Sequence, residues 1–262
     1  MKKILEVEIK DDILTLASDI VYEQKLDWCN ATVRPLKLSL IRPRNYFNYD
    51  CSATYPLLVW ICGGGFAGVD HNVWVPELVY FAKRDFAVAC ISYSIKDETR
   101  FPERETEVKS AIRYLRAHAG MYNINTDHIV IMGESAGAYL AAFTGLTNKE
   151  QEYEKGDNLN EDSFLITKVL AGNLWIGTKK MTSIKMAAVT DNVSELFPPA
   201  YISDAGVNSF SEQARRFYSK LNTVGVMAML NIYSGNNPEI SHGFECIDTV
   251  YSRDNANKMI AF

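Results

Sequence analysis

The sequence predicts an α/β fold in which a mostly parallel central sheet is covered by helices on both faces. Three observations predict it: short apolar runs recur along the chain, segments with helical periodicity separate them, and 262 residues with 47% hydrophobic content suffice for one large core. Continuous apolar runs are typical of strands that are buried on both faces. We therefore expect a single α/β domain over residues 1–262.

Seven segments are predicted to be strands because each is a short, mainly apolar run. They are Leu36–Ile41, Leu57–Ile61, Ala87–Ser92, His128–Met132, Ile166–Leu170, Ala200–Ser203 and Met227–Tyr233. The sequence contains no repeat or low-complexity tract between them. Their alternation with helices favours parallel pairing.

Helices are predicted where apolar residues recur at one-sided spacing. After Pro102 the spacing is i, i+3, i+4, i+7, and a second stripe follows the Ala200 strand. The two stripes consist of Val108, Ala111, Ile112 and Leu115, and of Phe210, Ala214, Phe217 and Leu221. Residues 148–162, rich in Glu, Lys and Asn, are predicted to form a solvated loop.

Charge and composition exclude several classes of function. The net charge of −5 and the lack of a basic stripe argue against a nucleic-acid partner. The N-terminal segment lacks the apolar core of a signal peptide and no run is long enough to span a membrane, so we expect a cytoplasmic protein that does not act at membranes.

The cysteines and histidines show no metal-binding spacing. The five cysteines are odd in number and include no C-x-x-C pair, which favours reduced and mostly buried thiols. They are Cys29, Cys51, Cys62, Cys90 and Cys246. An H-E-x-x-H motif is also lacking, so we expect neither a metal nor a cofactor.

The most informative motif is Gly133-Glu134-Ser135-Ala136-Gly137. It lies between a predicted strand and a helical stretch, and flanking glycines permit the strained turn that raises a serine hydroxyl above a sheet edge. The motif alone would arise by chance in roughly one chain in ten of this size. Its strand–turn–helix context makes Ser135 the predicted nucleophile.

A second motif, Cys62-Gly63-Gly64-Gly65-Phe66, directly follows the Leu57–Ile61 strand. Glycine amides can approach a developing negative oxygen, so we expect the N–H groups of Gly64, Gly65 and Ala136 to form an oxyanion hole. A dinucleotide loop is the rival interpretation, because three of the glycines satisfy G-x-G-x-x-G. It is disfavoured because the next strand ends in Ser-Tyr-Ser and not in an acid.

These motifs together resemble a known family. Strand-GGGF, then Ser92-Tyr93, then Phe101-Pro102 with an amphipathic helix, then GESAGA are similar to the α/β-hydrolase fold in its small microbial acetyl-esterase branch, which is related to the hormone-sensitive-lipase-like carboxylesterases. The resemblance runs from about residue 34 to about residue 244. Family members usually have His where Cys62 stands and Asp where Glu107 stands, which indicates a divergent member.

The resemblance implies a Ser, acid, His order of catalytic residues. His242 is the only histidine after Ser135, and Ser241-His242-Gly243-Phe244 is similar to the family's H-G-F signature after the last strand. The other three histidines, at positions 71, 118 and 128, are interpreted as structural.

The acid position departs from the family pattern. Aligning Pro198-Pro199-Ala200-Tyr201-Ile202 with the family's strand places Asn208 where an Asp is expected. An asparagine oxygen can accept the imidazole Nδ1–H but cannot stabilise the imidazolium with a full charge. Asp204, at the end of the same strand, is the substitute candidate, and the choice between Asn208 and Asp204 stays open.

The predicted function is a serine carboxylesterase that acts on short-chain, acetyl-like esters through an acyl-enzyme, with a small-molecule ester as its partner. The alternative is a catalytically impaired relative that binds a small molecule, because Asn208 replaces the acid. About thirty residues separate the Ile166 and Ala200 strands, too few for an elaborate cap. Phe66, Trp74 and Trp175 are the candidates for the wall of the substrate pocket, and a place in the hydrophobic core is the open alternative for these aromatic residues.

Overall fold

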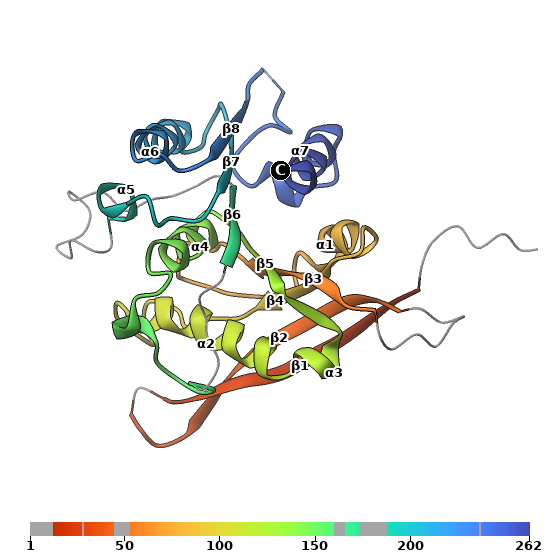
Figure 1. Cartoon of the computed structure of the whole chain (residues 1–262), viewed down its shortest axis with the longest axis vertical. Coiled ribbons are helices and arrows are strands. Elements are labelled where there is room, and N and C mark those ends of the chain that lie inside the picture. Colours follow the sequence, from red (N-terminus) through yellow and green to blue (C-terminus); the bar gives the residue numbers. More distant parts are fainter. Residues whose placement is uncertain (1–12, 28, 45–52, 160–165, 173–187, 236) are drawn as a thin grey trace, which may run out of the picture.

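The centre of the molecule is an eight-stranded sheet with strand order β1-β2-β4-β3-β5-β6-β7-β8 (Figure 1). The computed structural model describes residues 13–27, 29–44, 53–159, 166–172, 188–235 and 237–262. The strands are β1 (Ile13–Leu26), β2 (Val33–Arg44), β3 (Tyr55–Ile61), β4 (Ala87–Ile91), β5 (Ile124–Glu134), β6 (Ile166–Gly172), β7 (Ala200–Ala205) and β8 (Ala228–Tyr233). Strands β3 to β8 pair in parallel, whereas β2 pairs antiparallel with β1 and with β4. The α/β prediction is confirmed.

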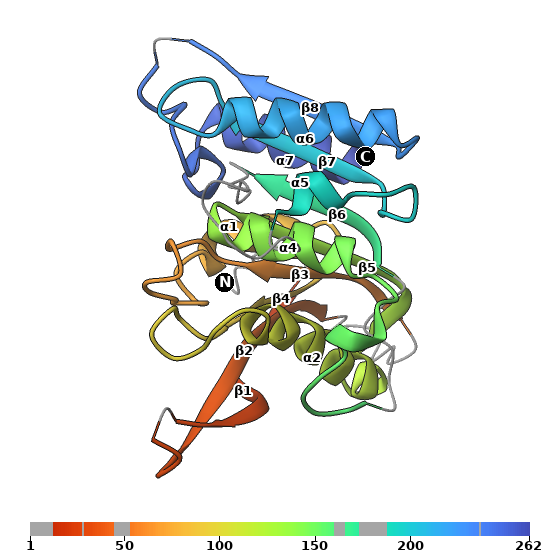
Figure 2. The same cartoon turned by 90° about the vertical axis from the view of Figure 1, so that its left-hand side faces the viewer.

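All seven predicted strands are present, and the one that the prediction lacks is β1. Most of its side chains are exposed or half-exposed, because it is the edge strand of a long hairpin with β2 that extends away from the body of the sheet (Figures 1 and 2). A strand with so little burial has no continuous apolar run, and that run was the signal used to predict the others.

Helices cover both faces of the sheet, as Figures 1 and 2 show. On one face lie α2 (Glu103–Ala117), α4 (Ala136–Leu146) and α6 (Ser211–Thr223), and on the other lie α1 (Val75–Ala82) and α7 (Val250–Ala261). Two shorter helices, α3 (Ala119–Tyr122) and α5 (Val189–Asn192), complete the described set. Alternate residues of β3 pack into different cores: Leu57 and Val59 into the one under α2 and α4, Trp60 into the one under α1.

The predicted loop after α4 is tied down more firmly than its composition indicates. It contains the 3₁₀ turn η1 (Gln151–Tyr153). Lys109 and Arg113 of α2 both pair with Glu154, and the side chains of the two cations are 1% exposed. Arg113 also donates to the backbone oxygens of Lys155 and Asp157. Only part of this loop is therefore solvated.

Candidate active site

Ser135 occupies a strained turn between β5 and α4. Its backbone has φ 53° and ψ −118°, a conformation that non-glycine residues rarely adopt. The flanking glycines are needed because a Cβ on Gly137 would lie 2.0 Å from the Ile61 oxygen, and one on Gly133 would lie 2.4 Å from the Gly137 oxygen. The turn places Ser135 at the carboxyl edge of a central parallel strand, where ligands bind in open α/β sheets.

Ser135 lines a cavity of about 300 Å³ together with residues from three other segments. Gly65 and Phe66 come from the glycine loop, Ala136 from the first turn of α4, and Phe210 from the segment before α6. The structure thus brings Ser135 together with two of the three predicted oxyanion residues and with one predicted pocket residue. Phe210 was missed, because its place in a helical apolar stripe favoured a core position.

The glycine loop needs its glycines for two different reasons. Gly64 has φ +118°, and a Cβ there would lie 2.2 Å from the Gly68 oxygen, so the turn itself excludes a side chain. Gly65 has φ +60°, and nothing lies within 4 Å of the point that a Cβ would occupy, because this residue faces the open cavity. Backbone at Gly65 is therefore accessible to a ligand beside Ser135.

Two buried side chains hold the glycine loop in place, Glu134 from the serine turn and Tyr93 from the segment after β4. Glu134 Oε1 accepts the Gly63 N–H at 2.7 Å, and the Tyr93 hydroxyl donates to the Cys62 oxygen at 2.8 Å. Burial raises the pKa of Glu134, and the Gly63 hydrogen bond opposes that shift. Sequence reasoning missed both residues as parts of the site, although Glu134 lies inside the nucleophile motif.

His242 lies in the turn between β8 and the 3₁₀ turn η3 (Phe244–Cys246). Its ring makes an edge-on contact with Phe210, with the ring centroids 5.2 Å apart; Phe210 lines the Ser135 cavity, whereas His242 is not among its lining residues. Partial desolvation lowers the pKa of His242 below 6.5. Among the described residues no hydrogen bond joins His242 to Ser135; such bonds are often long in a ligand-free enzyme.

In the described part of the chain, the polar side chain that contacts His242 belongs to neither of the two acid candidates. Ser209 Oγ lies 3.3 Å from His242 Nδ1. Asn208 is exposed with φ 51°, and no hydrogen bond between it and His242 is found in the part of the chain that the structure describes. Asp204 is fully buried at the end of β7, and burial raises its pKa to about 6. The sequence did not point to Ser209, because a serine residue carries no sequence signal that it will contact a histidine.

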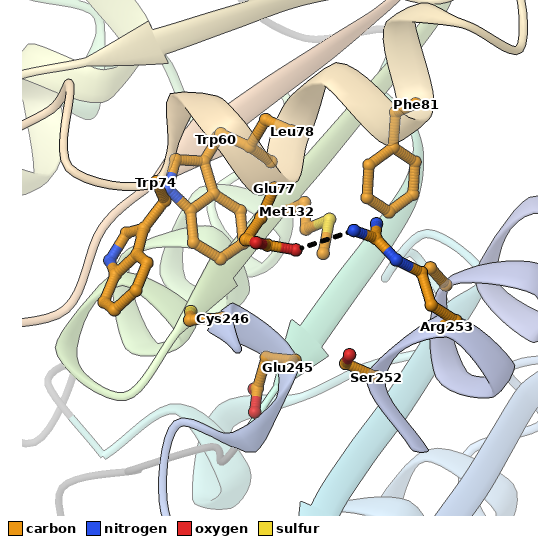
Figure 3. Close-up of a pocket in the computed structure, with 11 residues that line it drawn as sticks. Trp60, Trp74, Glu77, Leu78, Phe81, Met132, Glu245, Cys246, Ser252 and Arg253 are labelled. Atoms are coloured by element: carbon orange, nitrogen blue, oxygen red, sulfur yellow. Dashed lines mark hydrogen bonds and ion pairs between the residues drawn. The ribbon is translucent and has the colours of Figure 1, made fainter. Parts of the chain in front are cut away.

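Trp74 lies in a different pocket from the one predicted for it. It lines a space of about 20 Å³ between α1 and α7, with Trp60 beside it and the Arg253–Glu77 ion pair at 3.0 Å (Figure 3). That volume holds about one water molecule. Trp74 is not among the residues that line the Ser135 cavity. Trp175 lies outside the described residues.

His118 and Glu107 each have partners within the fold. His118 stacks on the Tyr114 ring with centroids 4.2 Å apart. Glu107 is buried and accepts the Ser94 N–H at 2.7 Å and the Ser94 hydroxyl. Within the described ranges no group of three or more metal-ligating side chains gathers, and no helix is both long and apolar enough to cross a membrane.

The cysteines that the structure describes are free thiols. Cys62, Cys90 and Cys246 are buried, whereas Cys29 is exposed; Cys51 lies outside the described residues. Burial raises the pKa of Cys62 and of Cys90 to about 12. These buried thiols are therefore poor nucleophiles at neutral pH.

Residues 46–214, more than half of the chain, match the BD-FAE family. The chain belongs to the BD-FAE family. It has the α/β-hydrolase fold: it superimposes on the crystal structure of esterase B from Lactobacillus rhamnosis with a TM-score of 0.75 and 19% identity, over 98% of this chain and 86% of that one.

Two curated relatives match this BD-FAE chain in part. An alpha/beta hydrolase of Acanthamoeba polyphaga mimivirus is 27% identical over 55% of this chain and 41% of its own length. LipM of Mycobacterium tuberculosis, named a probable carboxylic ester hydrolase, is 28% identical over 41% of this chain and 25% of its own length. The chain thus spans less than half the length of these relatives.

Proposed function

We propose that this BD-FAE chain is a carboxylic ester hydrolase whose nucleophile is Ser135. The observation that carries the proposal is the strained turn at Ser135, which opens into a cavity also lined by Gly65 and Ala136. Strain of this kind is kept in a fold where a side chain must be presented to a ligand. The name of LipM and the esterase structural neighbour support the same class.

The proposed reaction has two halves. Ser135 Oγ attacks the ester carbonyl while His242 Nε2 takes its proton, and the carbonyl electron pair moves to the oxygen. Collapse of this intermediate expels the alcohol, which takes the proton from His242. Water then attacks the acyl-enzyme while His242 takes its proton, and collapse of the second intermediate breaks the bond to Ser135 Oγ, which regains the proton from His242 as the acid is released.

The amides of Gly64, Gly65 and Ala136 are proposed to hold the oxyanion. Each hydrogen-bond donor in a preorganised site stabilises the transition state by about 3 kcal/mol. The Glu134–Gly63 hydrogen bond supports this assignment, because it fixes the loop that carries two of the donors to the turn that carries the nucleophile.

Short acyl groups are the proposed substrates, from acetyl to butyryl, on a small-molecule ester. A cavity of about 300 Å³ lies at the lower limit of ligand pockets, and Phe66 and Phe210 close it with rigid rings. The apolar lining suits an acyl chain better than a charged group.

An organophosphonate labelling experiment tests the nucleophile. We expect one adduct per chain, on the peptide that contains Ser135, and hydrolysis of an activated acetyl ester that Ser135→Ala abolishes. Ser219→Ala, a matched change at an exposed position of α6, should keep both. An adduct on another serine, or none after long incubation, would refute the assignment.

A binding protein without catalysis is the second candidate, and Asn208 is the observation that favours it. Its exposed side chain leaves the family's acid position without a charge. If the chain binds short-chain carboxylates or esters but Ser135 neither hydrolyses the activated ester nor takes up the phosphonate, this second function replaces the first.

A further inference from the structure

The segment between β7 and α6 places a hydroxyl beside the imidazole of His242. Ser209 Oγ lies 3.3 Å from His242 Nδ1, the ring nitrogen that an orienting group must hold. Because Ser209 engages Nδ1, the other ring nitrogen of His242, Nε2, is left to accept the proton of Ser135. Asn208, the neighbouring residue, projects from a left-handed backbone position and is exposed.

A buried carboxylate lies on the other side of Ser209. Asp204 is 0% exposed at the end of β7, and within the described part of the chain neither carboxylate oxygen has a hydrogen-bond partner of regular geometry. The Ser209 side chain and the amides of Ala205 and Phe210 nevertheless lower its pKa against the larger effect of burial. These groups therefore lie near enough to the carboxylate to stabilise its charged form.

We propose that Ser209 is a positioning residue whose hydroxyl connects His242 to the buried Asp204 carboxylate. A hydroxyl is both a donor and an acceptor, so it accepts the Nδ1–H of His242 and donates its own hydrogen to Asp204. No proton is transferred in this arrangement. It fixes the tautomer with a bare Nε2, and the Asp204 charge stabilises the imidazolium through one intervening group.

This inference rests on the proposed esterase function and explains how the chain keeps it without an Asp at position 208. The proposed charge is that of Asp204, which lies four residues before position 208 and is buried. Burying a carboxylate whose oxygens lack regular hydrogen bonds lowers the stability of the folded state. Such a group is therefore expected to serve the function of the protein. Orientation of His242 supplies one.

Kinetics of Ser209 variants with an activated aryl acetate test the connection. We expect Ser209→Ala to lower kcat on the order of a hundredfold with little change in KM, because Ser209 acts on His242 and does not line the cavity. Ser209→Thr keeps the hydroxyl and should regain most of the loss. The control Ser219→Ala, the same change on α6, should have wild-type kinetics.

Asp204→Asn tests the other end of the connection. It should lower kcat to a similar extent, and the double variant with Ser209→Ala should be no slower than the slower single variant, because both remove one path. Thermal unfolding of each variant verifies that the loss is not a loss of fold. Additive losses would overturn the proposal, as would equal losses in Ser209→Ala and Ser209→Thr.

Three further outcomes separate this inference from the proposed function. If Ser135→Ala and His242→Ala abolish hydrolysis while Ser209→Ala stays near the wild type, only the role of Ser209 is refuted. If Asn208→Asp also raises kcat, the orienting group is at position 208. If Ser135→Ala keeps hydrolysis, the proposed function itself fails.

Discussion

Glu134, the residue before the serine, shows how single side chains position this site. Its carboxylate is buried, accepts the Gly63 N–H, and lies where a Cβ on Gly63 would be, 2.2 Å from Oε1. One residue of the nucleophile motif therefore determines both the position of the glycine loop and the need for glycine at its second residue. Sequence position alone conceals this link, because the two residues are 71 apart.

A double-mutant cycle tests that link. Glu134→Ala should lower the free energy of unfolding by about 1–3 kcal/mol, because the buried Gly63 amide loses its acceptor. Gly63→Ala should lower kcat/KM at least tenfold in the wild type but little further in Glu134→Ala, where the clash is absent. Gly120→Ala, which meets nothing within 4 Å, is the control. Additive effects of the two changes would contradict the coupling.

The pKa of Asp204 makes stability depend on pH. Burial raises it from 3.8 to about 6, so the folded state binds the proton more tightly than the unfolded chain. The contribution to stability is then full below pH 3.8 and is lost as the pH rises through 6.

We therefore expect the wild type to lose up to about 3 kcal/mol of stability relative to Asp204→Asn between pH 3.5 and pH 7. Urea unfolding of both proteins across this range measures how the difference in their free energies of unfolding changes with pH. Any effect of the new amide that does not depend on pH leaves that change unaltered. Asp127→Asn, at an exposed position, should show no such trend. A difference that does not vary with pH would place Asp204 in contact with water.

At the scale of elements, α2 carries charge where a helix packed on a sheet is expected to be apolar. Its stripe of Val108, Ala111 and Ile112 is fully buried, as predicted. Its Lys109 and Arg113 are buried too, because the loop after α4 lies over them and supplies Glu154. Burial lowers the pKa of Lys109 even with Glu154 beside it.

Removing Glu154 should therefore be costly. Glu154→Ala leaves two buried cations without their shared carboxylate, and breaking such a pair from one side costs about 3–5 kcal/mol. Chemical denaturation measures the loss. Glu152→Ala, two residues away and exposed, should change stability by less than about 0.5 kcal/mol. Equal losses of stability in Glu154→Ala and Glu152→Ala would show that, in solution, Glu154 does not pair with Lys109 and Arg113.

At the scale of the whole molecule, the strand order brings the site together. The glycine loop follows β3, Ser135 follows β5 and Asp204 ends β7, and these parallel strands have their carboxyl ends at one edge of the sheet. The edge opens into a cavity of about 300 Å³ between Phe66 and Phe210.

The size of this cavity predicts a preference for short acyl chains. Aryl acetates and butyrates should be hydrolysed faster, by kcat/KM, than the aryl decanoate, because a long chain must leave the cavity and stay in water. Using one aryl alcohol throughout keeps the leaving group constant. Faster turnover of the decanoate would indicate an apolar channel beyond these two rings.

The sequence by itself determined those features that neighbouring residues specify. The serine turn could be predicted because a strand, five residues with two flanking glycines and a helix are contiguous. The glycine loop could be predicted from its place after a strand, whereas the role of His242 is implied by the family resemblance and stays a prediction. The fold class followed from continuous apolar runs, and β1 was missed because an exposed edge strand lacks one.

Only the tertiary structure decided which distant side chains meet. Ser209 and His242 are 33 residues apart, Glu134 and Gly63 are 71 apart, and Lys109 and Glu154 are 45 apart. Periodicity states which face of an element is buried but not which polar group of another element will lie opposite it. That is set by strand order and by the path of the loops, which is why Ser209 was missed beside Asn208.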